Sequence, residues 1–285
     1  MWLILGLSSG FFFALQSMVS KKVLKETNEY VTTFAYLAFS LPFFLLSLFW
    51  LEWASLNFTF WWATLANAVL TLAALIMLMT ALKIGELSLT IPFLSFTPVF
   101  LIFTSKLILG EMPSLLGIAG ILAIVGGAYV LNLKQEKGVA GPFRALLKNR
   151  AALLVLLVAF IYAISSNLDK IAVQNSNPIT YLIIVMAVRL PILLPFIYFK
   201  TEGKFGEIKS KWKVLLPIGL LTALTLFPQM IAYTLTIVPY VISLKRTSAL
   251  FSVILGFIAF KERNVKPKLL GAALMVAGVF LISMS

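Results

Sequence analysis

The sequence predicts an all-α integral membrane protein with ten transmembrane helices arranged as two inverted five-helix repeats. Three observations lead to this fold class: the composition, the length of the apolar runs and a weak internal repeat. Of 285 residues, 61% are hydrophobic and only 12% are charged, whereas a soluble domain usually has about 25% charged residues. In one water-soluble domain, this apolar excess would leave hydrophobic surface that nothing covers. A soluble protein is therefore excluded.

Apolar runs of about 20 residues, the length of a membrane-spanning helix, occur ten times. They are continuous rather than alternating, which argues against a β-barrel. In the first half we expect spans at residues 2–20, 31–51, 60–82, 87–108 and 114–133. In the second half we expect them at residues 151–173, 178–199, 214–236, 239–260 and 267–284.

Basic residues are distributed very unevenly between the connecting loops. Of the 23 Lys and Arg residues, 18 lie in loops that follow odd-numbered spans, and only Lys170 lies in a loop after an even-numbered one. Because positively charged loops tend to stay in the cytoplasm, the odd-numbered loops are expected to be cytoplasmic and both termini outside. We expect a multi-pass protein of the cell membrane. The net charge of +13 then reflects contact with an anionic leaflet, not with nucleic acid.

The two halves of the chain align weakly with each other. At an offset of 149, residues 14–21 align with residues 163–170, and residues 40–42 align with residues 189–191. At an offset of 151, matches pair Glu111 with Glu262, Gly120 with Gly271, Val125 with Val276 and Gly127 with Gly278. Five helices per copy is an odd number, so the second copy enters the membrane from the opposite side. We expect repeats at residues 1–133 and 151–285, joined by a basic cytoplasmic linker at residues 134–150.

The matched ends of the fourth and ninth spans, each followed by a glycine-bearing helix, resemble a known family. The segments are Leu109–Glu111 before Gly120–Gly127, and Phe260–Glu262 before Gly271–Gly278. They are similar to the paired EamA-type domains of the drug/metabolite transporter superfamily. The resemblance implies a secondary carrier of small metabolites. It also implies cytoplasmic termini, the reverse of what the charge distribution predicts.

Arg189 is expected about 11 residues into the seventh span, near the bilayer centre. An arginine there costs about 2.5–3.5 kcal/mol, so it should face the bundle interior or a wet cavity. It either tethers helix ends or an acidic partner, or it contacts the substrate.

Lys245 and Arg246 lie six or seven residues into the ninth span. Neighbouring helical residues point about 100° apart, so both can face one cavity only if the helix is broken there. Lys245 could instead extend to the surface.

Neutral polar residues in the spans form a second set of candidates. Amides are costly to bury without a partner, so we expect Gln16, Asn67, Asn167 and Gln229 to take part in substrate binding with the basic residues. Asp169 and Lys170 are expected at the membrane interface. Glu111 and Glu262 are expected to anchor helix ends. No acidic residue is then expected near the middle of a span, which leaves proton coupling without an obvious carrier. Proline kinks are expected in the spans at Pro42, Pro92, Pro98, Pro191, Pro195 and Pro228.

These features favour a secondary-active transporter that works by alternating access. Its substrate would be a small polar metabolite, such as an amino acid or another solute with a carboxylate or phosphate. The alternatives are an exporter of drugs or cationic solutes from the same superfamily, a channel, or a membrane scaffold that does not transport.

With no Cys and no His, the chain has no disulfide or ordinary zinc site. We expect no enzyme activity, no catalytic residue, no metal and no cofactor. The expected partners are the small-molecule substrate and the lipid bilayer, and the protein should act as a monomer or homodimer.

Overall fold

A computed structural model describes the chain except for residues 47–52, 85–92, 132–149, 202–203 and 261–265. The first half contains α1 (Trp2–Val23), α2 (Glu29–Ala38), α3 (Leu41–Leu45), α4 (Phe58–Ile84), α6 (Thr97–Leu109) and α7 (Leu115–Leu131). The second half contains α9 (Arg150–Gln174), α10 (Pro178–Lys200), α11 (Lys204–Leu235), α12 (Val238–Arg246), α13 (Ser248–Phe260) and α14 (Lys266–Ser283). The all-helical prediction is confirmed for this part of the chain.

Six helical segments are long and apolar enough to cross a bilayer. These are Trp2–Val23, Phe58–Ile84, Arg150–Gln174, Pro178–Lys200, Phe205–Leu235 and Val238–Leu255. Four shorter apolar segments, Glu29–Leu45, Thr97–Leu109, Leu115–Leu131 and Leu269–Ser283, occupy the other predicted positions. α11 begins about ten residues before the predicted eighth span. At 1.5 Å per residue it is about 48 Å long, so its first turns extend beyond a hydrocarbon core of about 30 Å.

Predicted spans are interrupted at several places among the described residues, and two of these breaks fall between assigned helices. The second span consists of α2 and α3, which are separated at Phe39 and Ser40 just before Pro42. The ninth consists of α12 and α13, which are separated at Thr247. Pro42 and Pro98 lie in the first turn of α3 and α6, where the missing backbone N–H costs nothing. We expected both prolines to kink a continuous span, but each lies at the start of a helix instead.

Four other prolines were expected to kink predicted spans. Pro191 and Pro195 are inside α10, and Pro228 is inside α11, as expected. Pro92 lies outside the described residues.

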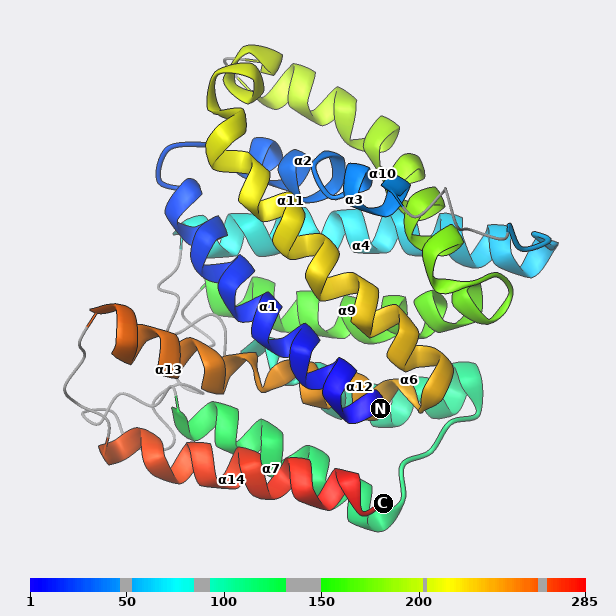
Figure 1. The fold of residues 1–285 in the computed structure, drawn as a ribbon, viewed down its shortest axis with the longest axis vertical. Coiled ribbons are helices and arrows are strands. Elements are labelled where there is room, and N and C mark those ends of the chain that lie inside the picture. The colour runs from blue at the N-terminus through cyan, green and yellow to red at the C-terminus, as the bar shows by residue number, and fades with distance from the viewer. Residues whose placement is uncertain (47–52, 85–92, 132–149, 202–203, 261–265) are drawn as a thin grey trace.

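The helices pack as one layered bundle in which segments from the two halves alternate (Figure 1). α4 packs mainly against α9, and α1 mainly against α11. α7 and α14 form a close pair along one edge. Both chain termini lie on one side of the molecule, and the C-terminal ends of α1, α7 and α13 lie on the opposite side (Figure 1). The side with the C-terminal ends of α1, α7 and α13 is called here the basic face. The other is called the terminal face.

Glycines allow α7 and α14 to approach each other closely. A Cβ added to Gly120 would lie 2.8 Å from the carbonyl oxygen of Gly278, and one added to Gly127 would lie 2.6 Å from that of Gly271. Real Cβ atoms do not come this close to backbone, so a side chain at any of these positions would push the helices apart. Small residues have this role at many helix contacts in membranes.

We predict that Gly127→Ala destabilises the protein, while Gly126→Ala in the same helix does not. The added methyl at residue 127 meets the backbone of α14, and overpacking of this kind costs about 1–3 kcal/mol. A Cβ at Gly126 meets nothing within 4 Å, and alanine is the better helix former. Thermal unfolding of both purified variants in one detergent measures the difference. Equal melting temperatures would contradict the close packing of α7 and α14.

Candidate functional site

The three basic side chains expected within the membrane meet at one internal cavity. Arg189 of α10 and Lys245 and Arg246 of α12 line a space of about 60 Å³ bounded by α1, α2, α4, α9, α10, α11 and α12. All three are at least nine-tenths buried, with exposed fractions of 4%, 8% and 4%. The other polar residues that line the cavity are Tyr36, Thr71, Tyr162, Ser165, Ser166, Asp169, Tyr181 and Gln229.

Lys245 and Arg246 are the last two residues of α12, and both line this cavity. The backbone N–H of Thr247 donates to the carbonyl of Leu244, and the helix is interrupted at Thr247. The interruption comes after both residues, so the two adjacent side chains reach the cavity from the same helical turn, against the expectation that a break would be needed. Lys245 donates from Nζ to Oε1 of Gln229 over 2.6 Å, and this ammonium lies 4.9 Å from the centre of the Phe13 ring. Arg246 donates from a terminal nitrogen to the Thr97 hydroxyl over 2.9 Å.

Asn67 of α4 connects Arg189 to an acidic residue. A terminal nitrogen of Arg189 donates to Oδ1 of Asn67. The Nδ2 group of Asn67 donates to Oδ1 of Asp169 over 2.9 Å and to the backbone carbonyl of Ser165 over 2.7 Å. The hydroxyl of Tyr181 also donates to Asp169. A chain of hydrogen bonds thus runs from the guanidinium, through the amide, to the carboxylate.

The expected interfacial position of Asp169 is wrong. Asp169 lines the central cavity, together with Arg189 and Lys245. Its place near the C-terminal end of α9 suggested the interface, but neighbouring helices cover the last turns of α9, where Lys170, Ala172 and Val173 are buried. No sequence pattern marked Asp169, Tyr36 or Tyr181 as parts of one site, because they become neighbours only when α2, α9 and α10 pack together.

Among the described residues, none of the three cations has a carboxylate partner. In that part of the chain, ion pairs within 4.0 Å join Lys83 to Glu29, Lys170 to Glu111 and Lys211 to Glu207. Arg189, Lys245 and Arg246 bond instead to neutral oxygens, and the Nε atoms of both arginines have no hydrogen-bond partner among those residues. The cavity therefore combines three basic groups with one carboxylate, and it carries unused donors.

Three predicted site residues are not part of the cavity lining: Asn67, which contacts Arg189 and Asp169, and Asn167 and Gln16, which lie farther away. Asn167 accepts from the Ser105 hydroxyl over 2.7 Å and donates to the Thr104 hydroxyl over 3.2 Å, which ties α9 to α6. Gln16 donates to the hydroxyl of Thr222 in α11. It lines a neighbouring space of about 20 Å³ that shares Phe13 and Tyr36 with the central cavity and reaches Leu82 near the basic face.

On the terminal face, a buried ion pair joins three helix ends. Nζ of Lys170 pairs with Glu111 at the end of α6 and donates to the carbonyl of Thr236 over 2.8 Å. Glu111 also accepts from the backbone N–H of Val238 over 3.0 Å, at the first residue of α12. Lys170 is only 5% exposed, so it is covered by these helix ends instead of facing solvent. Glu111 does occupy a helix end as expected, and Glu262 lies outside the described residues.

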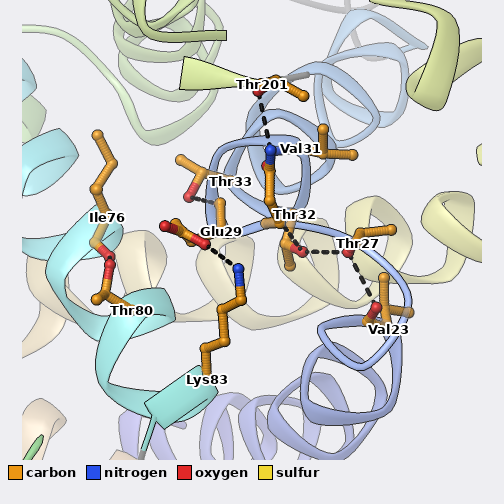
Figure 2. A network of polar contacts seen from close by, with 11 residues as sticks. Val23, Thr27, Glu29, Val31, Thr32, Thr33, Ile76, Thr80, Lys83 and Thr201 are labelled. Atoms are coloured by element: carbon orange, nitrogen blue, oxygen red, sulfur yellow. Dashed lines mark hydrogen bonds and ion pairs between the residues drawn. The ribbon is translucent and has the colours of Figure 1, made fainter. Parts of the chain in front are cut away.

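On the basic face, an exposed ion pair joins the start of α2 to the end of α4 (Figure 2). Lys83 Nζ lies 2.8 Å from Glu29, and these side chains are 43% and 20% exposed. Nearby, Asn28 donates to the Thr201 hydroxyl over 3.0 Å. Lys83, Glu29 and Asn28 line an open hollow of about 730 Å³.

The charge of Lys83 keeps this ion pair intact at neutral pH. Partial burial alone would raise the pKa of Glu29, but hydrogen bonds from Lys83 and the backbone, with the Lys83 charge, outweigh it. The pKa of Glu29 therefore falls below its usual value. The pair is lost only as the pH drops through that lowered value.

The described residues include no group of three or more His, Cys, Asp or Glu side chains that could hold a metal ion. What the central cavity offers is cationic donors for an anion, together with one carboxylate and several hydroxyls.

Comparison with known proteins extends over nearly the whole chain. The model of the EamA-like transporter family matches residues 1–133 and 149–284. No curated protein sequence matches. One crystal structure of another protein has a TM-score of 0.74 at 13% identity, covering 99% of this chain and 96% of its own. At this identity the likeness shows a common fold and nothing about function.

We predict that Glu111→Ala costs far more stability than Glu29→Ala. The first substitution leaves the buried Lys170 without its carboxylate, and breaking a buried pair in this way costs about 3–5 kcal/mol. The second removes an exposed pair, worth about 0–1 kcal/mol. Thermal unfolding of both variants at neutral pH makes the comparison. A small effect of Glu111→Ala would mean that the ion pair does not hold the terminal face together.

Proposed function

Since the chain belongs to the EamA-like transporter family of the drug/metabolite transporter superfamily, we propose that it is a secondary-active transporter for a small solute bearing a carboxylate or phosphate. An amino acid or a small organic acid fits best. The observation that carries this proposal is the central cavity, where Arg189, Lys245 and Arg246 are buried without a carboxylate partner among the described residues.

Electrostatics explains why these cations point to an anionic solute. A buried charge is costly unless it is paired, and neutral oxygens offset only part of that cost. A carboxylate or phosphate would supply the missing charge, and it would accept from the free Nε donors. Arginine binds both groups in a planar, bidentate arrangement that lysine does not provide. The cavity of about 60 Å³ is far smaller than the pockets of about 300–1,000 Å³ that hold drug-sized ligands.

An exporter of cationic drugs is the weaker alternative. Asp169 supplies the carboxylate that such a carrier needs, but its Oδ1 already accepts from Tyr181 and Asn67. Three nearby cations would also repel a positively charged ligand. Asp169 is better suited to receive the ammonium group of a zwitterion, which favours an amino acid. A channel is disfavoured because hydrogen bonds and ion pairs close both faces.

Inverted repeats at residues 1–133 and 151–285, joined by a linker at residues 134–150, are part of this proposal. The family model matches the chain twice. In the α7–α14 pair, Gly120 meets Gly278 while Gly127 meets Gly271. The internal alignment makes Gly271 the counterpart of Gly120 and Gly278 that of Gly127. Exchanging the two halves turns the Gly120–Gly278 contact into the Gly271–Gly127 contact. Both contacts are present, as a two-fold axis between the halves requires. Many carriers with inverted repeats place their substrate at the repeat interface.

Alternating access would open the two faces in turn. The Lys170–Glu111 pair would close the terminal face, and the Lys83–Glu29 pair the basic face. The small space beside Gln16 extends from the central cavity to Leu82, whose carbonyl accepts from Lys21. It supplies a route towards the basic face.

We place the protein in the cell membrane, with the basic face in the cytoplasm and both termini outside. The distribution of Lys and Arg supports this orientation. The transporter would work as a monomer or homodimer, with no nucleic-acid partner.

We predict that Arg189→Lys weakens anion binding while leaving the fold intact. Lysine retains the charge but loses the planar donor arrangement. A thermal-shift screen of wild-type protein against amino acids, organic acids and inorganic phosphate identifies the solute, and its affinity is then measured for each variant. Arg150→Lys, at an exposed position at the start of α9, is the matched control and should bind normally. Normal affinity in a destabilised Arg189→Lys protein would assign Arg189 a structural role instead.

We also predict that closing either face covalently stops transport. The native chain has no cysteine, so pairs can be introduced at residues 29 and 83, and separately at residues 111 and 170. A short thiol crosslinker should abolish uptake of the solute into liposomes in each double variant, and a reductant that cleaves it should restore uptake. Single-cysteine variants treated in the same way are the controls. Continued transport with either pair fully crosslinked would exclude alternating access through these two gates.

A further inference from the structure

Asn67 lies between the two opposite charges of the central site. Its side chain is completely buried, and it joins Arg189 on α10 to Asp169 on α9. The amide can have only one orientation. If its ends were exchanged, the NH₂ group would face the guanidinium donors, and its oxygen would face Asp169 and the Ser165 carbonyl.

Arginine and aspartate that line the same buried cavity would ordinarily form a direct, bidentate ion pair. Here they do not, because Asn67 accepts a hydrogen bond from Arg189 and donates one to Asp169. Its bond to the Ser165 carbonyl, at 2.7 Å, fixes the amide against the backbone of α9. The Thr71 hydroxyl, one turn further along α4, donates to Oδ1 over 3.2 Å. The spacing between the two charges is thus built into the contact of α4 with α9.

We propose that Asn67 is a positioning residue that keeps Asp169 from neutralising Arg189, so that the guanidinium stays available to the anionic group of the solute. This inference rests on the proposed function, because it assumes that the site binds an anion. It assigns Asn67 an electrostatic role, distinct from a direct contact with the solute. A direct Arg189–Asp169 pair would compete with the solute for the same donors.

Two isosteric variants test this role. Asn67→Asp places a carboxylate directly against Arg189. The exchange variant Asn67→Asp/Asp169→Asn does the same, but it leaves the total charge of the cavity unchanged. In the exchange variant the new amide at position 169 can donate to the new carboxylate at position 67, so one side-chain bond between α4 and α9 is kept. Both Asn67→Asp variants lose the bond to the Ser165 carbonyl, so their folding is compared with each other as well as with the wild type. Asp169→Asn alone is the opposite change, because it removes the carboxylate from the described lining of the cavity.

The probes are inorganic phosphate, succinate and glycine, titrated into purified full-length protein, with thermal unfolding measured on the same samples. For whichever probe binds the wild type most tightly, we expect the exchange variant to lose about 10- to 100-fold in affinity, the effect of losing one hydrogen bond to a charged group. We expect Asn67→Asp to lose at least as much. Asp169→Asn should raise the affinity for phosphate or succinate, because it removes a negative charge from the cavity, and it should lower the affinity for glycine, whose ammonium group Asp169 would receive.

The remaining outcomes separate this inference from the proposed function. Wild-type affinity in a folded exchange variant would mean that net charge alone governs binding, and would overturn the spacer role while leaving the proposed function intact. Lowered melting temperatures with normal affinity in both Asn67→Asp variants would make Asn67 merely structural and would also overturn it. Failure of the wild type to bind any of the three probes would overturn the proposed function and this inference together.

Discussion

The cost of burying positive charge without a carboxylate partner is the constraint on which the rest of the site depends. Each cation would cost about 2.5–3.5 kcal/mol at the bilayer centre, and the fold offsets this with neutral oxygens. Arg189 has Asn67, Lys245 has Gln229, and Arg246 has Thr97. Neutral acceptors satisfy the donors without cancelling the charge. Two of the three cations, Lys245 and Arg246, are adjacent in the last turn of α12, directly before the break at Thr247.

The ion pairs on the two faces of the molecule differ in their exposure to solvent. On the terminal face, Lys170 and Glu111 are nearly buried, and the pair also holds backbone groups of α11 and α12. On the basic face, Lys83 and Glu29 remain in contact with water beside a wide hollow. An exposed pair contributes little to stability, whereas separating a buried one is expensive. If the protein works by alternating access as proposed, separating the pair on the basic face costs less than separating the pair on the terminal face.

The sequence predicts the membrane helices well because hydropathy alone determines them. It also predicts that Arg189 is buried, since a charge deep in an apolar run is costly in contact with lipid, whereas it leaves open whether Lys245 extends to the surface. It fails for Asp169, which lies near the end of a span where the sequence pattern is the same for interfacial and buried residues. Whether such a residue meets lipid headgroups or another helix depends on packing, which a single chain's periodicity does not encode. The same reason separates Asn167, a tie between α9 and α6, from the other amides.

The charged chemistry of the cavity comes from one half of the chain. Asp169, Arg189, Lys245 and Arg246 all follow the linker, whereas the first half contributes aromatic and hydroxyl groups such as Tyr36 and Thr71. In the internal alignment, Arg189 corresponds to Ser40, so the two halves differ most where the site needs charge. For the anionic solute proposed above, this asymmetry fixes the direction of binding. The charged end would face the second half, and the rest of the solute would lie towards Phe13, Tyr36 and Thr71 of the first.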